Sequence, residues 1–141
     1  MSQLTQRLAW TLAPTTIVHA HCDIPCGIYD PHAAELGAQT VARMVELLNG
    51  ISGDSPADRN KFARCVAVKE QHAEIVKHEV QVIWSDYFKP EHLVANPDLH
   101  TKVWNLLKLA GKNKQNIDAE AAAQLQASVK EFADIFWATK K

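Results

Sequence analysis

The stretch that decides the fold is SPADRNKFARCVAVKEQHAEIVKHEVQVIWSDYFKP, residues 55–90. The Ser-Pro pair at 55–56 is typical of a helix start, because a serine side chain accepts a bond from a free N–H of the first turn and proline fits the first helical position. Asp58 is placed to complete a capping box. Apolar residues then recur every three or four positions, which predicts one long helix that ends near Tyr87, before Pro90. Its apolar stripe is Phe62, Cys65, Val66, Ala73, Val76, Val80 and Ile83.

Three more helices are predicted around this one. Asp30-Pro31 and Gly50 bracket a helix over 31–49. Asn96-Pro97 opens another that ends at Gly111, and a polar loop over 112–116 leads to the last. Their inward positions are Leu36, Val41, Met44, Leu47 and Leu48 in the first, Leu99, Val103, Leu106, Leu107 and Ala110 in the next, and Ala122, Leu125, Val129, Phe132 and Phe136 in the last.

No segment has the alternating pattern of a β-strand. Four amphipathic helices joined by short loops can bury their apolar stripes only against one another. The sequence therefore predicts an all-α fold, an antiparallel four-helix bundle over residues 30–141.

Composition limits the functions to consider. The chain has 141 residues, 47% of them apolar and 22% charged, which is typical of one globular domain. Its formal net charge of -1 gives no basic excess, so nucleic acid is not an expected partner. No apolar run approaches the roughly 20 residues that span a bilayer, so a membrane is not expected either.

Residues 1–20 differ from the rest of the chain. They hold no acidic residue and one base, Arg7, and Pro14 with nearby threonines interrupts their apolar residues. We expect them to be a pro-segment that is removed in the cytoplasm, leaving a working domain over 21–141. Two alternatives stay open: an export signal, since Val18-His19-Ala20 resembles a signal cleavage site, and an ordinary ordered N-terminus.

The segment HCDIPCGIYDP, residues 21–31, carries the candidate chemistry. His21, Cys22 and Cys26 are a plausible set of metal ligands, because thiolate and imidazole suit the later first-row transition metals. Two cysteines separated by three residues are weak evidence alone, and structural zinc ligation or incidental thiols remain open.

Cleavage after Ala20 would change what this segment can bind. His21 would then carry a free α-amine, and that amine, the amide nitrogen and thiolate of Cys22, and the thiolate of Cys26 would form a plane of donors, with the imidazole available axially. Planar nitrogen and sulfur coordination favours nickel(II) or copper(II), whereas zinc prefers a tetrahedron.

The segment resembles the nickel hook of the nickel-containing superoxide dismutases, H-C-x-x-P-C-G-x-Y. The resemblance continues at residues 69–71 (KEQ), 77–78 (KH), 84–90 (WSDYFKP) and 135–137 (IFW). It implies dismutation of superoxide to oxygen and hydrogen peroxide through a Ni(II)/Ni(III) cycle, with one nickel per subunit held by His21, Cys22 and Cys26. It also implies a homohexamer, a dedicated maturation peptidase and a hook turned at Pro25 through a cis peptide bond, with Gly27 permitting a close turn.

The resemblance assigns further roles around the hook. Tyr29 and Tyr87 are expected at its mouth as a gate, and Lys89 is the candidate for steering the superoxide anion. Some family members support the axial imidazole with a Glu and an Arg, and Gly37 and His72 stand at those positions here, so this support differs. Cys65, on an apolar stripe, is expected to be a core thiol. The alternative function is a non-catalytic helical module that holds zinc or copper.

Overall fold

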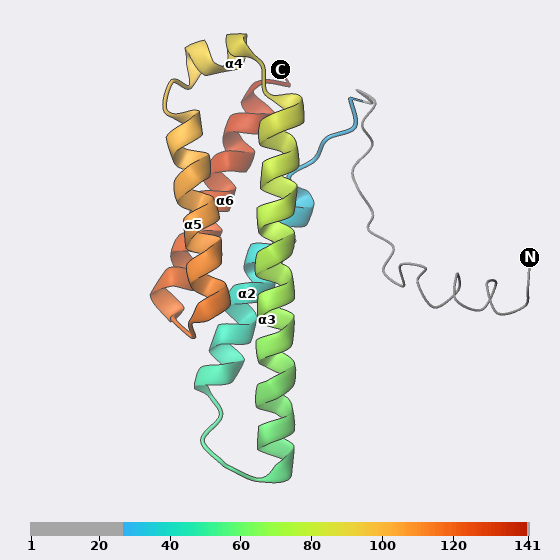
Figure 1. Cartoon of the computed structure of the whole chain (residues 1–141), viewed down its shortest axis with the longest axis vertical. Coiled ribbons are helices and arrows are strands. Elements are labelled where there is room, and N and C mark those ends of the chain that lie inside the picture. The colour runs from blue at the N-terminus through green and yellow to red at the C-terminus, as the bar shows by residue number, and fades with distance from the viewer. Residues whose placement is uncertain (1–26, 141) are drawn as a thin grey trace, which may run out of the picture.

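The computed structural model describes residues 27–140, which form five α helices and one π-helical turn and contain no strand. The elements are α2 (His32–Asn49), α3 (Pro56–Val82), η1 (Ile83–Tyr87), α4 (Pro90–Ala95), α5 (Leu99–Gln115) and α6 (Ala119–Ala138). The four long helices run alternately down and up (Figure 1). The prediction of an all-α antiparallel four-helix bundle is confirmed.

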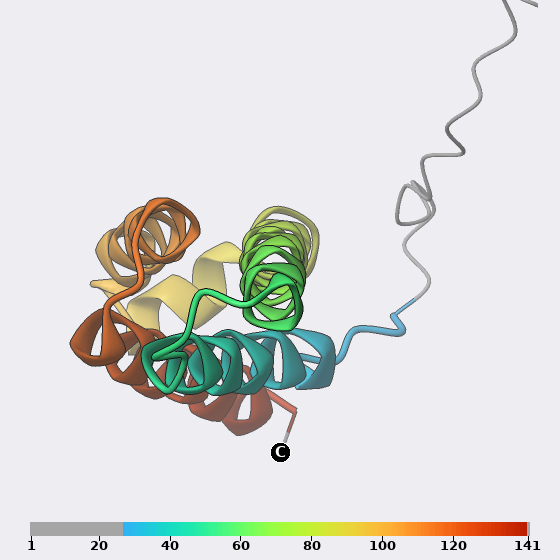
Figure 2. The same cartoon turned by 90° about the horizontal axis from the view of Figure 1, so that it is seen from below.

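The four long helices form two layers. Seen along the bundle, α3 and α5 lie side by side on one side, and α2 and α6 on the other (Figure 2). Helix α2 packs against both α3 and α6, and α5 packs against the same two helices, so each helix has two neighbours. The end of α3, all of α4 and the end of α6 meet at one end of the bundle, and α2 begins in the half of the bundle nearer this end (Figure 1). None of the helices within residues 27–140 has the length and apolarity needed to cross a membrane.

Local capping explains where the helices begin. The Ser55 hydroxyl accepts a bond from the Asp58 N–H at 3.2 Å, and the Asp58 carboxylate accepts from the Ser55 N–H at 3.2 Å. The Ser55 hydroxyl also donates to the Asp58 carboxylate at 2.6 Å, and this bond, together with the one from the Ser55 N–H, holds the pKa of Asp58 below its ordinary value. Asp30 accepts from the His32 N–H at 2.7 Å, and Asp118 accepts from the Ala121 N–H at 3.0 Å. The predicted starts of the long helices therefore agree with the structure to within a few residues.

The end of α3 is less regular than predicted. The helix reaches Tyr87, but its last turn widens into the π-helical η1, where the Phe88 N–H donates to the Ile83 carbonyl at 3.3 Å. Helix α4 was not predicted. It begins at Pro90 after two extended residues, and it is only six residues long, too short to show a periodic pattern.

The predicted end of α5 at Gly111 is wrong, because the helix continues to Gln115. The last carbonyls of a helix have no partner within the helix. Here Lys69 of α3 donates to the carbonyls of Asn113 and Lys114, and the Asn113 amide donates to the carbonyls of Leu109 and Ala121 at 3.0 Å each. A cap from another helix, 44 residues away in sequence, extends α5 beyond the glycine.

The core lies between the two layers. Two residues expected to face it are exposed: Leu36, by 48%, and Phe62, by 44%. Leu36 lies about 200° around α2 from the buried Ala38, and Phe62 lies on the first turns of α3, which extend past α5 and α6 (Figure 1). Cys65 is buried, as predicted for a core thiol. The core cluster is Ala34, Ala38, Val41, Val45, Ala73, Val76, Val80, Ile83, Leu99, Val103, Leu106, Ala110, Ala122, Leu125, Val129, Phe132 and Phe136.

Candidate active site at the end of the bundle

The two tyrosines of the chain meet at the end of the bundle where the hook sequence joins it. Tyr29 lies in the segment that leads into α2, and Tyr87 is the last residue of η1. Their ring centroids are 5.6 Å apart and the ring planes are inclined by 54°. Gly27, which follows Cys26 directly, has a φ of +70°, which agrees with the close turn expected there. The structure thus brings the end of the hook motif to the WSDYFKP block.

Tyr87 is the centre of an aromatic cluster. Its ring lies 4.6 Å from that of Phe136 and 5.4 Å from that of Phe88, centroid to centroid. The His92 ring stacks on it at 5.6 Å, with only 20° between the planes. Contacts from α4, α6 and the segment before α2 therefore fix the position of Tyr87, whose side chain is half-buried.

Lys89 lies two residues beyond Tyr87, in the extended link to α4. Its backbone N–H donates to Nδ1 of His92 at 3.2 Å, which ties the link to the same histidine that stacks on Tyr87. The Lys89 side chain is exposed. Its cation is thus available to a small anion that approaches this end of the bundle.

Three residues of this cluster were missed at the sequence level: His92, Thr139 and Lys140. The phenol oxygen of Tyr87 and Oγ1 of Thr139 are 2.7 Å apart, and Nζ of Lys140 lies 4.7 Å from the centre of the Tyr87 ring. The IFW block at 135–137 lies close by in sequence, but no local pattern predicts a contact that spans 52 residues.

The expected metal ligands His21, Cys22 and Cys26 lie outside the described residues, as does the expected cis bond before Pro25. Over residues 27–140, no group of three or more His, Cys, Asp or Glu side chains is arranged to hold a metal ion. Two thiolates, one imidazole and an amine form a donor set that fits nickel.

Gly37 and His72 lie against each other where α2 crosses α3. A Cβ on Gly37 would lie 2.9 Å from Cγ2 of Val76 and 3.1 Å from the His72 carbonyl oxygen. This close approach of the two helices leaves no room for a longer side chain at position 37. The His72 ring is committed locally, since its Nδ1 lies 2.9 Å from the Val68 carbonyl oxygen, which can only accept the bond. The expectation that the support of the His21 imidazole differs at these two positions stays a prediction.

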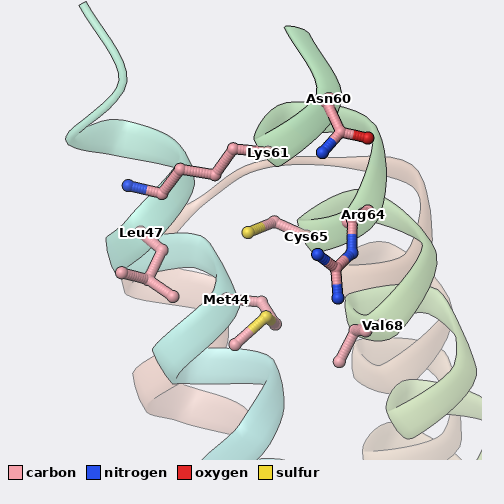
Figure 3. Close-up of a pocket in the computed structure, with 7 residues that line it drawn as sticks. All are labelled: Met44, Leu47, Asn60, Lys61, Arg64, Cys65 and Val68. Atoms are coloured by element: carbon pink, nitrogen blue, oxygen red, sulfur yellow. The ribbon is translucent and has the colours of Figure 1, made fainter. Parts of the chain in front are cut away.

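A separate pocket of about 290 Å³ opens between α2 and α3, toward the other end of the bundle. Its lining residues are Met44, Leu47, Asn60, Lys61, Arg64, Cys65 and Val68, and the sulfur atoms of Met44 and Cys65 face each other across it (Figure 3). It is not part of the candidate active site.

A short motif with one histidine and two cysteines that leads into a four-helix bundle indicates a metal-binding helical protein. A family model described as nickel-containing superoxide dismutase matches residues 16–140. The chain is 40% identical over 134 residues to the superoxide dismutase [Ni] of Streptomyces coelicolor and 38% identical to that of Streptomyces seoulensis. Each alignment covers 95% of this chain and 98% of the relative.

Solved structures agree with these matches. A native nickel superoxide dismutase structure superposes with a TM-score of 0.76 at 40% identity, and covers 86% of this chain and 100% of its own. The chain belongs to the nickel-containing superoxide dismutase family. The resemblance seen in the sequence is thereby confirmed, and with it the enzyme class and nickel as the metal, one per subunit; the alternative of a non-catalytic zinc or copper module is not favoured.

Proposed function

We propose that residues 21–141 form the working enzyme and that it converts superoxide to oxygen and hydrogen peroxide at a hook made by His21, Cys22 and Cys26. One observation carries this proposal: the Tyr29–Tyr87 contact joins the residues that follow the hook motif to the aromatic end of the bundle. The segment that carries the proposed donors therefore joins the bundle at the end where Lys89 and Lys140 are exposed.

The donors match the chemistry that dismutation requires. Superoxide must be oxidised in one half-reaction and reduced in the other, so the centre needs a potential between the two. Nickel held by this set would supply the one-electron step, alternating between Ni(II) and Ni(III). Two thiolates and a deprotonated amide nitrogen would donate electron density strongly and bring the higher oxidation state within reach, and the His21 imidazole would be a further nitrogen donor.

Removal of residues 1–20 is part of the proposal, because the α-amine of His21 exists only after cleavage. One comparison supports it: 86% of this chain covers the whole of the solved native relative, which is close to the share that residues 21–141 represent. A dedicated maturation peptidase would make the cut, and the cytoplasm is the proposed location, with export as the alternative.

The aromatic mouth has two tasks in this proposal. Tyr29 and Tyr87 would form a narrow gate that admits superoxide and excludes larger molecules from the thiolates, which are prone to oxidation. Lys89 would raise the local concentration of the anion, because exposed cations beside a site speed the arrival of an oppositely charged substrate.

We also propose that the subunits assemble as a homohexamer. Large apolar side chains exposed on the bundle would be available for contacts between subunits. Those exposed by 44% or more are Ile28, Leu36, Phe62, Val94, Trp104 and Trp137. Sedimentation of the processed protein, with a hexamer as the expected species, tests this.

The deciding experiment compares the chain that begins at Met1 with the chain that begins at His21. The processed chain should bind one nickel per subunit, show the low-spin Ni(III) signal of an ion with an axial nitrogen, and dismutate superoxide; the longer chain should not. Cys22→Ser or Cys26→Ser should abolish activity and leave the helical content unchanged, and Cys65→Ala should keep activity. Equal activity of the two chains would refute the role of the amine.

A further inference from the structure

Thr139 fixes the direction of the Tyr87 hydroxyl. Oγ1 of Thr139 donates its single hydrogen to the Phe136 carbonyl at 2.6 Å, and a carbonyl can only accept. The same Oγ1 lies 2.7 Å from the Tyr87 phenol oxygen. Because the threonine hydrogen is already used, the Tyr87 O–H must be the donor in the second bond. The phenol hydrogen therefore points toward the end of α6, and the lone pairs of the oxygen remain available.

Lys140 adds a charge at the same place. Its Nζ lies 4.7 Å from the centre of the Tyr87 ring and 5.3 Å from that of Phe136, within the range of a cation–π contact. No carboxylate of residues 27–140 forms an ion pair with Lys140 or with Lys89. The exposed acids closest in sequence to the mouth are Asp30, Asp86 and Glu91. Tyr87 thus has the cation of Lys140 over its ring and a second exposed lysine, Lys89, two residues along the chain, and neither lysine forms an ion pair within residues 27–140.

We propose that the C-terminal pair Thr139–Lys140 completes the mouth of the site: Thr139 is a positioning residue that locks the Tyr87 side chain, and Lys140 is a second steering cation for a small anion. The inference deepens the proposed function and rests on it. It predicts that residues 139–140 affect catalysis in two ways besides capping α6: Thr139 holds the Tyr87 side chain in place, and Lys140 adds positive charge near the site.

The Thr139 part can be tested without nickel. Tyr29 and Tyr87 are the two tyrosines of the chain, so ring-labelled tyrosine gives a simple NMR spectrum. In the metal-free chain that begins at His21, Thr139→Val should shift the Tyr87 ring signals and speed its ring flips, and Thr139→Ser should restore them. The matched control is Thr40→Val, since Oγ1 of Thr40 also donates to a carbonyl within its own helix, at 2.8 Å, but contacts no tyrosine.

The Lys140 part is tested in the nickel-loaded enzyme. Lys140→Gln should lower the rate at low ionic strength by about two- to fivefold and flatten its salt dependence, and Lys140→Arg should keep both. The matched control is Lys108→Gln, because Lys108 makes a similar contact with Trp104, at 5.3 Å, on another face of the bundle.

The outcomes separate the two proposals. If the loaded wild-type enzyme has no dismutase activity, the proposed function fails, whatever the tyrosine spectrum shows. If it is active, but Thr139→Val leaves the Tyr87 signals unchanged or Lys140→Gln behaves as Lys108→Gln does, the inference is overturned. Should Thr139→Val lose its helical signal in circular dichroism, Thr139→Ala serves for the same comparison.

Discussion

Lys69 provides the sharpest test of what holds the bundle together. Its side chain is only 1% exposed, and its ammonium donates to the carbonyls of Asn113 and Lys114 in the last turn of α5. No carboxylate of the described residues pairs with it. Carbonyls at the C-terminal end of a helix carry a partial negative charge, so they serve as the partner of this buried cation.

Lys69→Met keeps most of the apolar stem and removes the ammonium. Each hydrogen bond from a charged group stabilises by about 1.5–3 kcal/mol, and two are lost. Part of this loss is offset, because the variant no longer buries a charged group. We expect the free energy of unfolding to fall by about 2–4 kcal/mol. The matched control is Lys114→Met, which removes an ion pair with Glu74 in which the carboxylate is largely exposed; such pairs contribute about 0.2–1 kcal/mol.

Urea unfolding of the metal-free chain, followed by circular dichroism, measures both variants. With a slope of about 1–3 kcal/mol per molar urea, Lys69→Met should shift the midpoint by roughly 1–2 M and the control by a few tenths. If Lys69→Met were as stable as the control or more stable, then burial of the charge would outweigh its bonds to the carbonyls, and the assignment of Lys69 as the cap of α5 would be refuted.

The pH dependence gives a second readout on Lys69. Burial lowers the pKa of Lys69 below its ordinary value of 10.5. Between the lowered value and 10.5, the unfolded chain binds more protons at this residue than the folded chain does, so its contribution to stability rises with pH. The difference in unfolding free energy between wild type and Lys69→Met should therefore grow toward pH 10.5. A difference that shrinks over this range would contradict the lowered pKa, because it would mean that the bonds to the carbonyls favour the charged form of Lys69 more than burial disfavours it.

Three further predictions concern the crossing of the helices, the hook turn and the mouth. Gly37→Ala should lower the free energy of unfolding in urea by about 1–2 kcal/mol, because the new Cβ would meet Val76 and His72. Gly111→Ala is the control: nothing lies within 4 Å of its new Cβ, so it should raise the free energy of unfolding by about 0.5–1 kcal/mol. Equal effects of the two variants would refute the close crossing of α2 and α3. Gly27→Ala should weaken nickel retention in dialysis, since a φ of +70° strains any other residue by about 1 kcal/mol, and unchanged retention would show that this turn does not shape the hook. Lys89→Ala should lower the rate about two- to fivefold at low ionic strength and weaken its salt dependence; an unchanged rate would remove the steering role.

Local signals predicted the helices well and their ends less well. The starts follow from side chains that bond within three residues, as Ser55 and Asp118 do. The extension of α5 depends on Lys69, which no pattern near Gly111 could reveal. Phe62 fits the apolar stripe, but its exposure depends on how far α3 extends past its neighbours, which is a property of the assembled bundle.

The residues of the candidate site were likewise predicted only in part. The hook ligands and Tyr29 lie in one short motif, so the sequence alone indicates them. The contact between Tyr29 and Tyr87 was expected only through the family resemblance. The stacking of His92 and the bond to Thr139 arise where α4 and α6 converge on η1, and they depend on tertiary packing that a linear pattern does not encode.

The topology explains why the segments before the first long helix and after the last one meet at one end of the bundle. In an antiparallel bundle with an even number of long helices, the chain enters and leaves at the same end. The segment before α2 and the residues after α6 therefore both reach Tyr87 (Figure 1). With one long helix fewer, Lys140 would lie a helix length away, roughly 30 Å for the 20 residues of α6. Tyr29, before the first long helix, and Thr139, after the last, thus both contact Tyr87 because the number of long helices is even.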